Sequence, residues 1–213
     1  RPSAIQRLVW HALDSHNPFM SAALDALVDR IRPDVISFHN LSGWSAGVWP
    51  VASKHKIAAV QVLHDYYHLC PRSQMFRRGR LCSEPCTACK AFRFGRRDAS
   101  ARLQGVIGVS RAVLDSHLQR GLFGSVSIRS VVHNARSFRV TPRTEYGPSA
   151  SRFGFIGTLG DWKGVHCLLE SFRRVSRQPG GEALELLVAG TGDAKYFADL
   201  QAEFASPRVR FLG

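Results

Sequence analysis

Short apolar strands that alternate with amphipathic helices are the feature of this 213-residue sequence that most constrains its fold. Apolar residues recur from Leu24 to Ile31 at the i, i+3, i+4 and i+7 spacing of one helix face. Pro33 then ends the helix, and the apolar residues 35–38 predict a short buried strand. Alternation of this kind predicts an α/β fold, in which helices flank a parallel sheet.

The same alternation continues to the end of the chain, with one interruption. Residues 136–151 hold two prolines, serines and threonines without an apolar period, which is typical of a linker. Because doubly wound sheets usually have five or six strands, we expect two Rossmann-like doubly wound domains, both incomplete in this chain. The predicted parts are a first domain at 1–138 with a cysteine-rich insert at 70–97, a linker at 139–151, and a second domain at 152–213.

Composition limits the classes of protein. The hydrophobic content of 45% is sufficient for a packed core. The longest apolar stretches are far shorter than the roughly 20 residues of a membrane-spanning helix. The sequence begins at Arg1 and lacks the features of a signal peptide, so we expect the chain to belong to something longer. The net charge of +13 favours anionic partners, but the arginines are dispersed and no nucleic-acid motif is present, so we expect no nucleic acid partner.

Four loops that follow predicted strands contain residues that could bind a ligand or take part in catalysis. In open α/β sheets, ligands bind at the carboxyl ends of the strands. The loops are HNLSGWS at 39–45, HDYYHLCPR at 64–72, GTLGDWKG at 157–164 and GTGDAKY at 190–196.

The loop GTLGDWKG combines glycines with a lysine directly before a predicted helix. Gly157, Gly160 and Gly164 allow the backbone to approach a ligand, and the helix directs free N–H groups at it. Lys163 adds a cation, so a phosphate or diphosphate is a natural occupant. The loop is neither a G-x-G-x-x-G nor a Walker motif, and a tight turn with a surface lysine is the alternative.

His64 and Asp65 follow a predicted strand directly. A histidine at a strand end can donate a hydrogen bond to a substrate hydroxyl or to developing negative charge. The alternative is a structural histidine whose polar atoms are satisfied within the fold.

Taken in order, the motifs resemble the family 4 glycosyltransferases of the GT-B architecture, which have two Rossmann-like domains. The segments are RPDVISFHNLSGWS, VLHDYYHLCPR, GVIGVSRAVLDSHLQRG, VVHNA, FGFIGTLGDWKGVHCLLESF and LLVAGTGD. They extend over nearly the whole chain. The resemblance implies that residues 1–138 bind the acceptor and residues 152–213 bind the donor. It also implies retaining transfer of a sugar from a nucleotide-sugar donor to a cell-envelope or polysaccharide acceptor, either a saccharide or a lipid-linked one.

The resemblance also implies roles for individual residues. His64 would be catalytic, beside the transferred sugar. No cofactor or divalent metal would be required, because lysine, arginine and a helix terminus can neutralise the leaving diphosphate. The donor-binding residues would be Gly157, Thr158, Lys163, Gly190 and Gly192, and the acceptor-side residues would be His39, Asn40 and Asp65.

The sequence departs from that family at several positions. The family usually has an arginine where this sequence has Thr158 and a glycine where it has Ala135. The family's paired glutamates would lie beyond Gly213, and its glycine-rich first loop would lie before Arg1. We therefore expect this chain alone to have weak or no transferase activity. We expect a cytoplasmic location, with the basic charge favouring peripheral association with anionic lipid on the inner face of the membrane.

Four cysteines, Cys70, Cys82, Cys86 and Cys89, leave three interpretations open. Four thiolates could hold a structural zinc ion. The C-x-x-x-C-x-x-C spacing also matches an iron–sulfur cluster of the kind that cleaves S-adenosylmethionine. The third is reduced thiols or a disulfide. The corresponding functional alternatives are a protein organised by a zinc or iron–sulfur centre, or a non-catalytic binding fragment.

A similar cysteine-bearing insert occurs in a subset of the resembled family, which implies a structural loop over the acceptor side. The fifth cysteine, Cys167, falls on the predicted helix after Lys163, and we expect it to fill the core.

Overall fold

The computed structural model describes residues 3–137 and 151–213. The chain divides into two compact units, Arg1–Ser137 and Phe138–Gly213, which are described separately below. Residues 139–150 of the predicted linker lie outside the described residues. Across the described ranges, no helix has both the length and the apolar character needed to cross a membrane.

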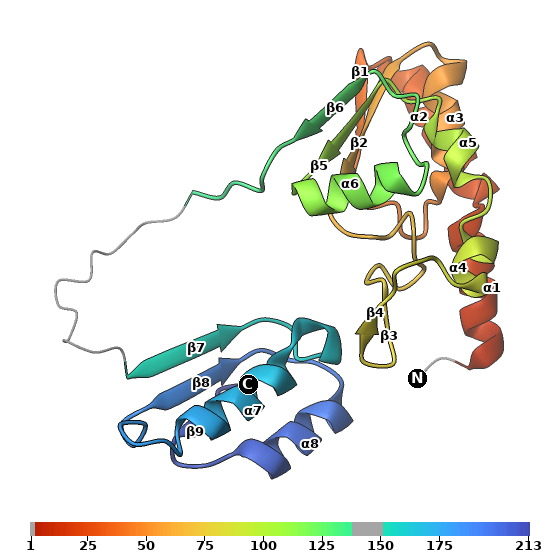
Figure 1. Ribbon diagram of the computed structural model, residues 1–213. Coiled ribbons are helices and arrows are strands. Elements are labelled where there is room, and N and C mark those ends of the chain that lie inside the picture. The colour runs from red at the N-terminus through yellow and green to blue at the C-terminus, as the bar shows by residue number, and fades with distance from the viewer. Residues whose placement is uncertain (1–2, 138–150) are drawn as a thin grey trace. The chain divides into compact units, whose positions relative to one another are not determined.

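The first unit contains a parallel sheet with helices packed against it (Figure 1). The strand order is β1-β2-β5-β6, with Val35 paired to Ala58 and Val60 paired to Gly105. The elements are α1 (Ala4–Ser15), α2 (Pro18–Ile31), β1 (Val35–Phe38), η1 (Ala46–Val48), α3 (Trp49–Lys54), β2 (Ala58–Leu63), β3 (Phe76–Arg77), β4 (Arg80–Leu81), α4 (Thr87–Phe92), α5 (Arg96–Ser100), β5 (Gly105–Gly108), α6 (Arg111–Gln119) and β6 (Ile128–Val131). The predicted α/β class is confirmed for this unit.

The first two helices begin at capping residues. The Ser3 hydroxyl accepts a hydrogen bond from the Gln6 amide, and the Gln6 side chain accepts one from the Ser3 amide, which forms a capping box. The Asn17 side chain accepts a hydrogen bond from the Met20 amide and so caps α2, and Pro18 occupies its first turn. The apolar period at Leu24–Ile31 predicts only the later part of α2, so α1 and the first turn of α2 are helical residues beyond that prediction.

The cysteine-rich insert folds into small elements only. The two-residue strands β3 and β4 form an antiparallel hairpin, and α4 and α5 follow it. Helix α1 packs against α4, since the Ser15 hydroxyl donates a hydrogen bond to the Phe92 carbonyl at 2.8 Å. The insert is therefore attached to the N-terminal helix.

The second unit has a three-stranded parallel sheet of order β7-β8-β9, and Figure 1 shows α7 and α8 packed on one side of it. The apolar core consists of Leu159, Val165, Leu169, Phe172, Leu186, Val188, Leu200, Phe204 and Val209. The elements are β7 (Arg152–Ile156), η2 (Asp161–Lys163), α7 (Val165–Val175), β8 (Glu185–Ala189), α8 (Ala194–Phe204) and β9 (Val209–Phe211).

One prediction about this core is wrong. Cys167 is exposed on α7 rather than packed in the core. The reason is its position on the helix, because Val165 and Leu169 occupy the buried stripe and Cys167 lies between them on another face.

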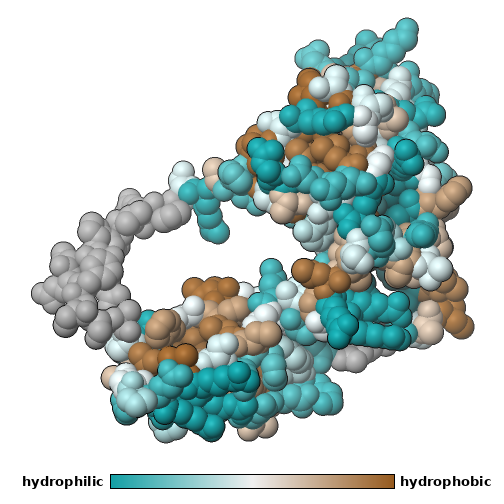
Figure 2. All heavy atoms as spheres, in the orientation of Figure 1, coloured by the Kyte–Doolittle hydropathy of each residue, from teal (hydrophilic) through white to brown (hydrophobic). Residues whose placement is uncertain are grey.

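The described surface also presents apolar side chains. Figure 2 shows brown residues along α1, where five apolar side chains are at least 42% exposed. They are Ile5, Leu8, Val9, Trp10 and Leu13.

Candidate functional site

Two histidines meet at the carboxyl ends of β1 and β2. His39 follows β1 and His64 follows β2, and because the strands are parallel and adjacent their ends share one edge of the sheet. His39 Nδ1 lies 3.0 Å from His64 Nε2, and the two rings are stacked with centroids 5.3 Å apart. Ser37 Oγ lies 3.2 Å from His39 Nε2. The hydrogen bond between the rings requires one imidazole to donate and the other to accept.

A buried glutamine positions this pair. The Gln61 side chain is fully buried in β2, and its Nε2 donates to the His39 carbonyl at 2.8 Å. Its Oε1 accepts from the Trp49 indole N–H at 3.0 Å. Trp49 is itself fully buried at the start of α3, so the glutamine connects the core to the end of β1.

The predicted residues His39, Asn40, His64 and Asp65 all line one small cavity. The Asp65 carboxylate accepts a hydrogen bond from the Tyr67 amide at 2.7 Å, and the Asn40 side chain accepts one from the Ser42 amide at 2.9 Å. These two side chains therefore shape their own loops, which is the local role typical of Asx residues. Both imidazoles remain exposed and can form hydrogen bonds with a polar ligand.

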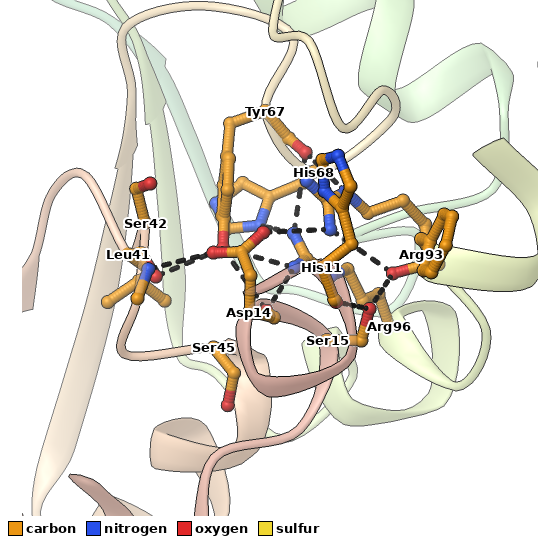
Figure 3. A network of polar contacts seen from close by, with 12 residues as sticks. His11, Asp14, Ser15, Leu41, Ser42, Ser45, Tyr67, His68, Arg93 and Arg96 are labelled. Atoms are coloured by element: carbon orange, nitrogen blue, oxygen red, sulfur yellow. Dashed lines mark hydrogen bonds and ion pairs between the residues drawn. The ribbon is translucent and has the colours of Figure 1, made fainter. Parts of the chain in front are cut away.

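A buried polar network lies directly behind this loop (Figure 3). The Tyr67 hydroxyl donates to Asp14 Oδ1 at 2.6 Å, and Arg93 Nη1 donates to Asp14 Oδ2 at 3.1 Å. The Gly43 amide donates to Asp14 Oδ1 at 2.8 Å. Arg96 Nη2 donates to the Tyr67 hydroxyl at 3.2 Å. The network thus connects α1, the loop after β1, the loop after β2 and the end of the insert.

Two guanidinium groups share this interior with a single carboxylate. The guanidinium carbons of Arg93 and Arg96 lie 4.6 and 4.5 Å from the centre of the Tyr67 ring. Stacking of cations on the ring supplements the one ion pair. Burial raises the pKa of Tyr67 to about 12, and burial together with Arg93 lowers the pKa of Arg96 to about 10, so both stay protonated at neutral pH.

Two histidines behind the loop are buried and neutral. Burial, followed by Arg96, lowers the pKa of His68 well below its ordinary value. Burial lowers the pKa of His117 to about 4, although its ring donates from Nδ1 to the Val113 carbonyl at 2.7 Å. These groups differ from His39 and His64, which are exposed at the sheet edge.

In the second unit, the loops after β7 and β8 pair with each other. The Leu159 amide donates to the Thr191 carbonyl at 2.9 Å, and Leu159 forms a parallel bridge with Gly192. A Cβ on Gly190 would lie 1.8 Å from the Gly157 oxygen, and one on Gly192 would lie 2.0 Å from the Leu159 oxygen. Gly190 and Gly192 are therefore required for the approach of the two loops to each other.

The loop after β7 leads into the N-terminus of α7. Gly164 is the N-cap in the left-handed conformation, with φ of 71°, and no side chain caps this helix. The first-turn N–H groups are consequently free of side-chain partners within the described residues. Lys163 immediately precedes the cap and is exposed, and Thr158 is exposed in the same loop. The arrangement offers backbone donors, a hydroxyl and a cation to an anionic group.

The four cysteines of the insert line a second cavity of about 220 Å³. The sulfurs of Cys86 and Cys89 are 3.7 Å apart, and the Cys89 thiol also contacts Cys70. In the described ranges, this cavity shares no lining residue with the one at His39 and His64. The cysteines are therefore separate from the residues at the strand ends.

Two other features do not involve the strand ends. A cavity of about 830 Å³ is lined mainly by α2, α3 and α5 and by none of the residues 38–40 or 63–65. Asp25, Asp29 and His55 bring ligand atoms within 4.8 Å of one another. Lys54 lies 2.6 Å from the Asp25 carboxylate and already neutralises it, which argues against a metal ion there.

Sequence reasoning located the strand-end residues but missed the buried network. Asp14, Arg93 and Arg96 had no motif that would select them, because their partners lie up to 82 residues away in the sequence. The order of strands and polar residues predicted that His39 and His64 each follow a strand, and the structure shows that these two strands are neighbours.

Comparison with known proteins supports the fold. No family model matches the chain. A curated relative, described as an uncharacterized 42.6 kDa protein in the cps region of Klebsiella pneumoniae, is 25% identical over 211 residues. The match covers 98% of this chain and 54% of the relative, so the chain spans about half the length of that protein.

Solved structures agree with both parallel sheets. TarM matches with a TM-score of 0.61 and 14% identity, covering 91% of this chain and 36% of TarM. HepE of Anabaena, in complex with UDP, matches with a TM-score of 0.61 and 16% identity, covering 91% and 51%. The pneumococcal O-GlcNAc transferase GtfA, in complex with UDP and GlcNAc, matches with a TM-score of 0.56 and 13% identity, covering 91% and 37%. The predicted α/β fold of the GT-B type is confirmed.

Proposed function

We propose that this chain is part of a retaining glycosyltransferase of family 4 that transfers a sugar from a nucleoside diphosphate donor to an acceptor. The acceptor in this proposal is a saccharide or lipid-linked group of a cell-envelope or polysaccharide pathway. The observation that carries the proposal is the position of Lys163, directly before the uncapped N-terminus of α7 and after β7. The fold shared with HepE and GtfA, both described in complex with UDP, supports a nucleotide ligand.

On the donor side, we propose that catalysis depends on electrostatic stabilisation of the leaving diphosphate. As the glycosidic bond to the diphosphate breaks, negative charge grows on the leaving phosphate oxygen. Lys163 and the first-turn amides of α7 would neutralise this charge without a metal ion or other cofactor. Thr158 would contribute a hydroxyl donor where the resembled family has an arginine. This position therefore contributes less charge than in that family.

The acceptor unit supplies the strand-end histidines. We place His64 beside the transferred sugar, with His39, Asn40 and Asp65 on the acceptor side. Because His64 Nε2 contacts His39, its Nδ1 is the ring nitrogen left to bind a sugar hydroxyl. His39 would fix the orientation of the His64 ring, and Gln61 would fix His39 through its carbonyl.

The net charge of +13 supports a cytoplasmic protein that binds the anionic inner face of the membrane peripherally. We include this location in the proposal, together with the absence of a nucleic acid partner. Flotation with vesicles containing anionic lipid tests it. Protein that stays in the soluble fraction at low salt would count against membrane association.

Binding of UDP to the 213-residue chain tests the donor site. We expect UDP to raise the thermal midpoint of the second unit and uridine to have a much smaller effect, because the diphosphate provides the charge. Lys163→Ala should weaken UDP binding about tenfold or more, since charge-assisted hydrogen bonds contribute about 1.5–3 kcal/mol.

Arg174→Ala is the matched control. Arg174 is also an exposed cation of the second unit, but it lies in the last turn of α7, at the other end of the helix from Lys163, and pairs with Glu170 at 3.2 Å. It should leave UDP affinity unchanged. An equal loss of UDP affinity in both variants would show a general effect of charge. If UDP, GDP and ADP all fail to stabilise the unmodified chain, the donor site is refuted.

A further inference from the structure

The four cysteines of the insert meet in one cavity although they come from separate elements. Cys70 lies in the loop after β2, Cys82 follows the β3-β4 hairpin, and Cys86 and Cys89 belong to the start of α4 and its first turn. Cys70 and Cys89 are buried, and Cys82 and Cys86 are half-buried. The fold thus gathers four thiols from a 20-residue segment around a common space of about 220 Å³.

The spacing of these sulfurs suits a tetrahedral ion. Zinc–sulfur bonds of about 2.3 Å place neighbouring sulfurs of a tetrahedral site about 3.8 Å apart. The Cys86 and Cys89 sulfurs are 3.7 Å apart, and the Cys89 thiol contacts both Cys86 and Cys70. The described residues place no three cysteine sulfurs within 4.8 Å of one another, so at least two of the four side chains must rotate to bring their sulfurs into a tetrahedral site.

The charges around the cavity match a tetrathiolate site. Zinc with four thiolates has a net charge of −2, which needs cationic neighbours when it is partly buried. Arg72 and Arg77 line the cavity. His11 of α1 lines it as well, and in the described part of the chain its Nδ1 is a buried atom without a hydrogen-bond partner. A thiolate sulfur in the cavity would give this nitrogen an acceptor.

The hairpin of the insert, residues 76–81, gains little stability from its own secondary structure. Its strands have two residues each, and Ser73, Met75 and Arg78 adopt positive φ angles without being glycine. Leu81, the apolar residue beside Cys82, is 78% exposed. A segment this polar gains little from burial, whereas a metal clip supplies folding free energy directly.

We propose that Cys70, Cys82, Cys86 and Cys89 bind one structural zinc ion, which fixes the insert against α1. This site is independent of the proposed sugar transfer, because it shares no residue with it. It stabilises the first unit and performs no chemistry on substrate.

Metal analysis of the full chain tests the proposal. We expect one equivalent of zinc per chain after purification without chelator, and no iron. Single replacement of any of the four cysteines by serine should lower zinc affinity at least tenfold in competition with a chromophoric chelator. Cys167→Ser is the matched control, since this exposed thiol lies in the second unit and should leave one equivalent bound. His11→Ala should also retain one equivalent.

Thiol alkylation of the unmodified chain gives a second measurement that does not depend on folded variants. With zinc bound, Cys167 should react at once and the other four only after a chelator is added. Five thiols that react at equal rates, a disulfide between Cys86 and Cys89, or visible absorbance with bound iron would each overturn the proposal. Full zinc retention by Cys82→Ser would overturn the four-thiolate ligand set.

Discussion

Arg93 Nη1 lies 3.1 Å from Asp14 Oδ2, with the two side chains 4% and 0% exposed and 79 residues apart in the sequence. The pair joins the N-terminal helix to the end of the cysteine insert. Tyr67, in the loop that begins at His64, joins this pair because its hydroxyl donates a hydrogen bond to the Asp14 carboxylate. The loop with the candidate catalytic histidine therefore rests on a buried ion pair.

We predict that Asp14→Asn destabilises the first unit by about 3–5 kcal/mol, because it leaves the Arg93 charge buried without its partner. Urea unfolding of the full chain measures the change. The control is Glu185→Gln, which breaks the exposed pair with Arg152 in the second unit and should cost at most about 1 kcal/mol. Equal effects of the two substitutions would contradict a special role for the buried pair.

The buried His117 predicts loss of stability in mild acid. Its pKa is about 4 in the folded chain against an ordinary value of 6.5, so the unfolded state binds the proton more readily. Its contribution is fully present above pH 6.5 and is lost as the pH falls toward 4, by about 3 kcal/mol in total. Unfolding midpoints measured from pH 7 to pH 4.5 test this. His117→Asn should reduce the dependence without abolishing it, because the buried His68 also has a lowered pKa.

The loop glycines of the second unit have a structural role that is measurable without nucleotide. We predict that Gly190→Ala and Gly192→Ala each cost about 1–3 kcal/mol, because the new Cβ would meet a carbonyl oxygen within 2.0 Å. Gly154→Ala is the control, since its Cβ would meet no atom within 4 Å. Thermal unfolding of the three variants in the absence of ligand is the measurement. Unchanged midpoints for Gly190→Ala and Gly192→Ala would show that the loops can separate.

Gln61 should contribute to both stability and the site. Gln61→Leu leaves the buried Trp49 indole N–H without its acceptor, which we expect to cost about 1–3 kcal/mol. The double variant with Trp49→Phe should recover part of this loss, because the unpaired donor is then removed. Urea unfolding gives the stabilities, and the imidazole NMR signals of His39 show whether its position depends on Gln61. If the double variant recovers no stability, the loss in Gln61→Leu comes from altered packing and not from the unpaired indole N–H.

The sequence by itself determined the alternation of strands and helices and the place of the polar loops. Helical and strand periods depend on residues a few positions apart, so Leu24 to Ile31 and residues 35–38 reveal their elements locally. Parallel strands end at one edge, which is why the polar residues after the strands, His64 among them, were expected to line a ligand site. The contact between His39 and His64 follows from the pairing of β1 with β2, which only the structure shows.

The tertiary structure alone decided which distant side chains share an interior. Asp14 and Arg93 have no local signal, since each appears in the sequence as an ordinary charged residue, and their burial follows from how α1 packs on the insert. The same packing brings His11 to the cysteines. Contacts of this kind depend on three-dimensional packing, which the local hydrophobic period does not encode.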